Sequence, residues 1–295
     1  MPPVAVLLGR HLFVGVAMFT RRLKLSALAA VASFAIINSA HSADMPAPVL
    51  APAVDFSGWY LRGDIGFSNQ SVGSLFNANY ANFASVTNID KSFDAAPFFG
   101  LGIGYTVNNW LRFDVTGEYR GAANFHGFDV GNIGGGGVAD DRYTGSKSEW
   151  TFLLNGYVDL GTWWNITPFI GAGVGFSRNT ISNFGDISVC VNSASCAVSG
   201  GSDAYAGSAS KWNFAWALHA GLAYQVYRNV TLELAYRYID LGNAQTGDLI
   251  AFDGTNNFYN PTEFHHLTSQ DVKLGVRFNF GGYDYPPPPP LRSRG

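Results

Sequence analysis

The chain has 295 residues, of which 13% are charged and 15% are aromatic, and its formal net charge is −3 at neutral pH. Beyond the first forty residues, no apolar run reaches the roughly 20 residues that a spanning helix needs. A helical membrane protein is therefore excluded, and any membrane embedding has to be carried by strands.

The N-terminal part has the order of a secretory signal peptide. Basic residues in 21–24 precede an apolar stretch, and small residues follow it. We expect residues 1–42 to be removed after export, with 1–17 an upstream extension that reflects the choice of start codon. A retained membrane anchor is the alternative, although the apolar run is short for spanning. Removal takes four of 18 basic residues and no acid, so the balance becomes 14 − 21 = −7, which argues against a nucleic-acid partner.

Strands are marked by an alternation of apolar and ionisable side chains. In 111–119, Leu111 and Phe113 fall on one face of a strand, while Arg112 and Asp114 fall on the other, because side chains alternate with a period of two. The ionisable face is too charged to be a core. The same pattern recurs near both ends of the mature chain, and it is typical of a barrel that contacts lipid outside and is polar inside.

Eight strand segments are predicted in chain order: 58–68, 97–107, 111–121, 149–160, 166–178, 211–226, 230–240 and 270–280. Three connections are short, and four are long and polar, in strict alternation; the long ones are 69–96, 122–148, 179–210 and 241–269. This predicts an all-β fold, an eight-stranded antiparallel up-and-down transmembrane β-barrel over 57–280 with periplasmic turns and extracellular loops. Residues 43–56 are expected to be a periplasmic segment, and the proline-rich 281–295 a periplasmic tail in polyproline II conformation.

Aromatic residues gather at both ends of the predicted strands. The short-turn end carries Trp59, Tyr105, Trp110, Trp163, Trp164, Tyr224 and Tyr227, and the long-loop end carries Trp150, Trp212 and Tyr238. We interpret them as girdles at the two membrane interfaces. A soluble lipocalin-like barrel is the alternative, but it would place its charges outside and has no reason for unequal loop lengths.

The predicted lumen contains six cations and six anions: Arg62, Arg112, Arg120, Arg237, Lys273 and Arg277 against Asp64, Asp114, Glu118, Asp159, Glu233 and Asp271. Because the interior of eight strands is just wide enough for side chains to fill, this balance indicates an ion-paired polar plug. A small diffusive pore remains an alternative. Inward glycines at 100–104 and 171–175 would leave room for long side chains from facing strands.

Other residue types suggest little chemistry. Cys190 and Cys196 lie close together in an exported chain, which predicts a loop disulfide rather than a metal site. His265, His266 and Ser269 are the best candidates for a nucleophile and base if the barrel were a lipid-modifying enzyme, but no carboxylate is clearly placed to orient them. We expect no catalytic residue, metal or cofactor, and we expect His219 to be a hydrogen-bonded lumen residue.

The segments 56–61, 167–175 and 232–242 resemble porin-family surface proteins of the Omp25-like or opacity-like kind, which are related to the OmpA transmembrane barrel. The resemblance covers about 55–280. It implies an outer-membrane protein of envelope integrity and surface exposure, without catalytic residues. Such proteins end on an aromatic assembly signal, and Phe280 occupies that place although a tail follows it.

The partners expected for such a protein are outer-membrane lipids, lipopolysaccharide and the barrel-assembly machinery. Surface binding by the long loops is a further alternative, whether to host molecules or to other ligands, because loops on rigid scaffolds commonly carry function. The sequence does not identify an extracellular ligand.

Overall fold

A computed structural model describes residues 58–134, 137–191, 203–256 and 258–280. Its elements are β1 (Trp59–Phe76), the 3-10 helix η1 (Ala78–Asn82), β2 (Ser85–Phe93), β3 (Ala96–Thr106), β4 (Leu111–Gly134), β5 (Gly137–Asp159), β6 (Ile166–Val191), β7 (Ala204–Ala206), β8 (Ala209–Tyr227), β9 (Val230–Ala251) and β10 (Pro261–Asn279). The predicted signal peptide (1–42), the segment 43–56 and the tail 281–295 lie outside the described residues. In the part of the chain that is described, no helix is long and apolar enough to cross a membrane.

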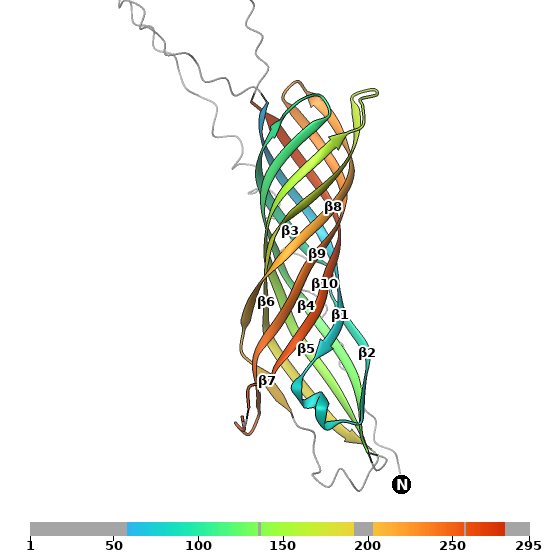
Figure 1. Ribbon diagram of the computed structural model, residues 1–295, viewed down its shortest axis with the longest axis vertical. Coiled ribbons are helices and arrows are strands. Elements are labelled where there is room, and N and C mark those ends of the chain that lie inside the picture. Colours follow the sequence, from blue (N-terminus) through green and yellow to red (C-terminus); the bar gives the residue numbers. More distant parts are fainter. Residues whose placement is uncertain (1–57, 135–136, 192–202, 257, 281–295) are drawn as a thin grey trace, which may run out of the picture. The chain divides into compact units, whose positions relative to one another are not determined.

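The strands form one closed antiparallel ring (Figure 1). All strand pairs are antiparallel, and β1 pairs with β10 from Tyr60↔Asn279 to Phe76↔Glu263, which closes the ring. The strands β2 and β3 share one place in the ring, since both pair with β4, and β7 and β8 share another, since both lie between β6 and β9. The predicted eight-stranded up-and-down barrel is confirmed.

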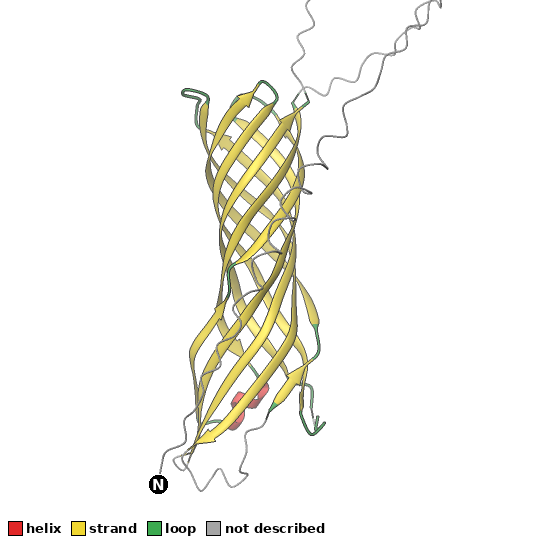
Figure 2. Cartoon of the chain, turned by 180° about the vertical axis from the view of Figure 1, so that it is seen from behind, coloured by secondary structure: helices red, strands yellow, loops and turns green. Residues whose placement is uncertain are grey.

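The predicted short turns are present as loops between adjacent strands (Figure 2). Side-chain hydrogen bonds and backbone conformation explain two of them. Asn108 accepts hydrogen bonds at its Oδ1 from the backbone N–H groups of Trp110 and Leu111, at 3.0 and 2.8 Å. Between β5 and β6, Trp164 and Asn165 have φ values of 51° and 64°, the left-handed pair that a type I′ hairpin requires. Both turns bring adjacent strands back antiparallel within a few residues.

The prediction of four long polar loops was wrong. Strands β4, β5, β6, β9 and β10 continue 9 to 13 residues past the predicted strand ends, and β2, η1 and β7 fall in segments predicted as loops. These continuations are rich in Gly, Ser and Asn, so they lack the charge-against-apolar alternation from which the other strands were predicted. The barrel therefore extends well beyond the predicted membrane segment.

Bulges change the phase of the strands where this continuation begins. In β4 the inward side chains are even-numbered up to Arg120, then odd-numbered from Ala123, and the β4–β5 register shifts between these residues. Comparable irregularities coincide with positive φ at Asn183 in β6, Gly242 in β9 and His266 in β10. An extra residue in a strand reverses which face each later side chain occupies.

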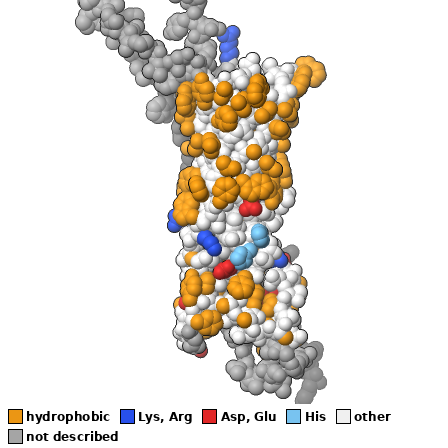
Figure 3. Space-filling view, viewed as in Figure 1, with side chains coloured by type: hydrophobic (Ala, Val, Ile, Leu, Met, Phe, Trp, Pro, Cys, Tyr) orange, Lys and Arg blue, Asp and Glu red, His pale blue; other side chains and the backbone are white. Residues whose placement is uncertain are grey.

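The outer surface changes character at the same level. Towards the short turns, large hydrophobic side chains point outward, among them Leu101 and Phe67, which are 73% and 66% exposed (Figure 3). Beyond the bulges, outward positions include charged and titratable side chains, such as His126 on β4 and Arg142 on β5, beside exposed apolar ones such as Ile187. We call the first region the membrane part and the second the extracellular part.

Candidate functional site: the filled barrel interior

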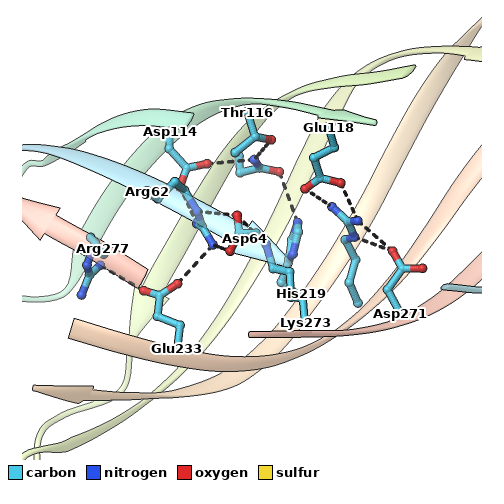
Figure 4. Close-up of polar contacts among 12 residues, drawn as sticks. Arg62, Asp64, Asp114, Thr116, Glu118, His219, Glu233, Asp271, Lys273 and Arg277 are labelled. Atoms are coloured by element: carbon cyan, nitrogen blue, oxygen red, sulfur yellow. Dashed lines mark hydrogen bonds and ion pairs between the residues drawn. The ribbon is translucent and has the colours of Figure 1, made fainter. Parts of the chain in front are cut away.

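Arg62 is the centre of one ion cluster inside the membrane part (Figure 4). Its guanidinium lies 2.8 Å from Asp64, 2.7 Å from Asp114 and 3.2 Å from Glu233, which come from β1, β4 and β9. All four side chains are buried. A buried arginine can use its planar fork to bind several carboxylates at once, which a lysine cannot do equally well.

Arg237 is the centre of a second cluster. It donates two hydrogen bonds to the Glu118 carboxylate, at 2.8 and 2.7 Å, and one to Asp271 at 2.9 Å. Asp271 also accepts two bonds from Arg120, at 2.9 and 2.8 Å, and Arg120 lies 2.7 Å from Glu149. The two arginines and their carboxylates thus link β4, β5, β9 and β10 across the lumen.

The other predicted lumen charges lie around these two clusters. Arg112 is 3.3 Å from both Asp159 and Glu233, and its guanidinium stacks 4.1 Å from the ring centroid of Tyr157. Arg277 also approaches Glu233, and Lys273 approaches Asp64, at 3.4 and 3.6 Å. The structure therefore places all twelve predicted lumen residues inside the barrel, each with at least one opposite charge within ion-pair distance.

Several interior residues were not identified from the sequence. Lys147 contacts Glu149 and donates to Gln70 at 2.7 Å, beyond the predicted start of its strand. Asn155 donates to Asp114, and its Oδ1 accepts from His219 Nε2 at 3.2 Å, so the prediction that His219 is a hydrogen-bonded lumen residue is confirmed. The alternating inward positions of β5 carried a signal for Lys147 that was missed because this segment was predicted as a loop.

The inward glycines make room for large side chains, as predicted. A Cβ atom added at Gly104 would overlap the ring of Tyr60, and one at Gly171 would overlap the ring of Tyr157. Tyr60 in turn donates to Asp114 at 3.1 Å. The large lumen side chains of one strand can therefore pack only because the facing strand carries glycine at these positions.

The extracellular part has a second filling, of aromatic rings. Phe93, Phe125, Phe184 and Phe264 are buried inside the barrel. Ring centroids of Phe125 lie 5.0 Å from Phe93 and 4.9 Å from Phe264, and Phe184 lies 6.2 Å from Phe264. We call these four side chains the phenylalanine cluster. They come from β2, β4, β6 and β10, so they cross the interior from opposite walls.

The predicted girdle residues point outward or lie half-buried at the surface. Tyr119 and Trp150 have ring centroids 4.9 Å apart, and Trp150, Phe152 and Trp212 continue the row with separations of 6.3 Å. At the short-turn end, Trp59 and Tyr105 pair at 5.4 Å. These are the two levels at which amphipathic rings meet a membrane interface.

Two further predicted features lie at the edges of the described structure. Cys190, on β6, is disulfide-bonded, and its predicted partner Cys196 lies outside the described residues. Phe280 follows β10, donates its backbone N–H to the carbonyl of Trp59 at 2.9 Å and is 44% exposed. Its role as an assembly signal stays a prediction.

The candidates for enzymatic chemistry are separated in the structure. His265 lies 3.0 Å from Glu263 at the surface, whereas the buried Ser269 hydroxyl donates to Asp271 at 2.5 Å. His266 is exposed, and its backbone has a positive φ of 55°. Among the described residues, no group of three or more His, Cys, Asp or Glu side chains has an arrangement that could hold a metal ion.

Comparison with known proteins places this barrel in a family. An uncharacterized protein of Brucella abortus is 29% identical over 285 residues, covering 86% of this chain and 94% of its own. A candidate adhesin of Rickettsia rickettsii is 28% identical, covering 79% and 95%. Among solved structures, Pseudomonas aeruginosa OprG aligns with 15% identity and a TM-score of 0.45, covering 76% of this chain and 96% of its own.

Neisserial surface protein A aligns similarly, with 16% identity, a TM-score of 0.42 and coverage of 76% and 98%. The model of the outer membrane protein beta-barrel domain matches residues 26–280, which is most of the chain. The chain therefore belongs to the outer membrane protein β-barrel domain family and is an integral barrel of the outer membrane.

Proposed function

We propose that this protein is a non-conducting, non-catalytic barrel that stabilises the envelope and holds its extracellular rim at a fixed place above the membrane. Two successive seals in the interior support this proposal. The buried ion clusters around Arg62 and Arg237 fill the membrane part, and the phenylalanine cluster fills the extracellular part. An ion would have to displace paired charges and then cross packed aromatic rings.

Conductance is the direct test of the seals. Refolded wild-type protein in planar bilayers is expected to show no steady single-channel current. Arg237→Ala removes a guanidinium that holds both Glu118 and Asp271, so uncompensated carboxylates should admit water and raise the leak.

Arg178→Ala is the matched control, because Arg178 is a cation at an exposed outward position of β6. It should leave the bilayer as quiet as the wild type. A steady, large current from wild-type protein would rule out the seals and favour the diffusive pore.

Absence of enzymatic activity is part of the proposal. It is supported by the separation of Ser269 from His265, since a nucleophile and its base must come within hydrogen-bond reach. Ser269→Ala should therefore leave the lipid composition of the outer membrane unchanged when the variant is expressed. A change in acyl chains or headgroups that depends on Ser269 would contradict this.

A second candidate function is binding of a surface ligand at the rim. The relative described as a candidate adhesin favours it, as do exposed aromatic side chains at this end. Tyr205 and Phe252 are 44% and 69% exposed and pack 5.5 Å apart, and Phe258 and Tyr259 lie nearby along the chain and are also exposed.

Cell adhesion of bacteria that express wild type or Tyr205→Ser/Phe252→Ser tests this candidate. Reduced adhesion by the rim variant, with normal adhesion by a girdle variant such as Trp163→Phe, would support it. Equal adhesion by all three would remove it.

The same geometry leads us to propose an orientation and partners. The extracellular part points away from the cell, the short turns face the periplasm, and the outward girdles contact outer-membrane lipids, including lipopolysaccharide, after insertion by the barrel-assembly machinery. An impermeant thiol reagent should label intact cells at Asn79→Cys but not at Asn109→Cys. The reverse pattern would invert the orientation.

A further inference from the structure

Three aspartates lie together at the extracellular end of the barrel interior, next to the phenylalanine cluster. Asp129 on β4 is paired directly opposite Asp141 on β5, and Asp186 on β6 is paired with Tyr143 of β5. Asp129 is fully buried and Asp141 is 6% exposed. Like charges placed directly opposite each other on adjacent strands are destabilising, so this arrangement calls for protons or for compensation.

The described residues around the three aspartates supply no positive charge. The charged and titratable groups that face the three aspartates are Asp140 and Tyr143 from β5, Tyr80 from η1 and Asp203 from the segment before β7, with Asn88 of β2 and Ser188 of β6 as neutral partners. Among the described residues, none of the three forms an ion pair with a Lys, Arg or His. The Oδ1 atoms of Asp129 and Asp186 are buried and accept no hydrogen bond.

The chain between β1 and β2 passes over this cluster, and we call residues 77–84 the strap. Side chains attach the first half of the strap: Asn77 donates to Thr262 of β10 at 3.1 Å, and Tyr80 donates to Asp129 at 2.6 Å. At its end, the backbone N–H of Ala84 donates to the carbonyl of Asn132 on β4 at 2.7 Å. Beneath it lies a cavity of about 180 Å³, bounded by the strap on one side and by Asp141 and Asp186 on the other.

The wall beside the strap has few ladder bonds. Strand β1 pairs with β2 only at Ser71↔Ser92, and beyond that point β1 pairs with β10 alone and β2 with β4 alone. The strap therefore bridges an open seam in the barrel, and up to its last residue, Ala84, it is held by side-chain contacts rather than by a continuous sheet. Such a segment can be released without unfolding the strands on either side.

We propose that the aspartate cluster is a pH-sensitive latch: protons on Asp141 and Asp186 keep the strap closed over the barrel mouth, and their loss releases it. With protons present, one carboxyl can donate to its neighbour, and Asp129 remains the acceptor for Tyr80. With three carboxylates ionised in one buried place, mutual repulsion favours outward movement of the strap. Among the described residues that line the cavity, the strap alone is not part of a strand ladder.

The direction of the pH dependence follows from the ionisation of the two carboxyls. Burial, together with neighbouring carboxylates, raises the pKa of Asp186 from 3.8 to about 8 and that of Asp141 from 3.8 to about 6. At pH values between the ordinary aspartate pKa of 3.8 and the raised pKa values, the closed state therefore binds more protons than an open or unfolded state. The stability of the closed state is greatest at low pH. Closure is lost as the pH rises through about 6 to about 8.

Hydrogen exchange of strap peptides in the refolded protein, corrected for the intrinsic effect of pH on exchange, measures the latch. Between about pH 5 and about pH 9, protection of the strap should fall by about tenfold or more, because each unit of pKa difference changes closure about tenfold. Peptides from the membrane part should keep their protection. Equal strap protection at both pH values in the wild type would overturn the proposal.

Asp141→Asn/Asp186→Asn mimics the protonated pair, so its strap should stay protected at both pH values. Asp90→Asn is the matched control, since it removes a charge from an exposed position of β2, and it should behave as the wild type. Release of the strap in the double variant at high pH would overturn the latch.

Tyr80→Phe keeps the test decisive if the double variant does not fold. It removes only the hydroxyl that joins the strap to Asp129, so strap protection at low pH should fall towards the high-pH value of the wild type. Unchanged protection in Tyr80→Phe would show that this contact does not hold the strap and would overturn the latch.

Discussion

The membrane part and the extracellular part are built from the same strands, yet their side-chain faces have opposite polarity. In the membrane part of β4, Val115 points outward and is 53% exposed, while Arg112 and Glu118 are buried inside. In the extracellular part of the same strand, His126 points outward and Phe125 is buried inside. One continuous strand thus reverses its pattern where its surroundings change from lipid to water.

The bulges show how the reversal is achieved. The alternation of a strand has a fixed period, so a change of inward face requires an inserted residue, and the β4–β5 register shift at Arg120 and Ala123 supplies it. Apolar burial drives the extracellular packing as in a soluble protein, whereas ion pairs and hydrogen bonds fill the membrane part. Variants that act on one part only can separate these two contributions.

The largest effect is expected for Arg237→Ala. Loss of the guanidinium leaves Glu118 and Asp271 buried with fewer cationic partners, which should lower the free energy of unfolding by about 3–5 kcal/mol. Urea unfolding in lipid bilayers measures it. Arg237→Met keeps most of the side-chain volume, so a similar loss of stability in this variant would assign the effect to charge rather than to packing. A loss below about 1 kcal/mol in both variants would mean that the lumen network contributes little to stability.

An intermediate effect is expected for Val115→Arg on the lipid-facing side. A cation near the bilayer midplane should lower the stability by about 2–4 kcal/mol. The same residue introduced by His126→Arg, on the outward face of the same strand, should change it by no more than about 0.5 kcal/mol, because that position meets water. Equal costs at both positions would contradict the boundary drawn at the bulges.

The smallest effect is expected for Phe125→Leu in the phenylalanine cluster. A change of shape with similar volume should cost about 1.5 kcal/mol or less, and the ion clusters in the membrane part should remain intact. Urea unfolding gives the cost, and planar bilayers should still show no current. A leak in this variant would mean that the aromatic seal, rather than the charged one, closes the barrel.

The membrane part could be predicted from the sequence because lipid and charge impose a strict alternation. Arg112 and Asp114 could be assigned to the lumen, since neither is tolerated against lipid. Their partners could not be assigned: Arg62 meets Glu233 across a separation of 171 residues, which depends on the tilt and stagger of the closed ring.

The extracellular part was not predicted as strands for a different physical reason. Its inward face mixes apolar residues such as Phe125 with acidic ones such as Asp129, and its outward residues are only sparsely charged, so no regular contrast between faces marks the strands. The phase shifts at Ala123 and Asn183 also interrupt the period that a reader of the sequence follows. The acidic latch could not be found either, because Asp129, Asp141 and Asp186 converge only once these strands are extended.

The length of the strands has a consequence for recognition from outside the cell. The 23 residues of β5, at about 3.4 Å each and a tilt of about 40°, span roughly 60 Å along the barrel axis, of which a bilayer covers roughly 25 Å. An antibody that reaches the rim therefore meets side chains brought together from neighbouring strands rather than a flexible peptide. Serum raised against the unfolded chain should bind intact bacteria poorly, and serum raised against refolded barrel should bind them well.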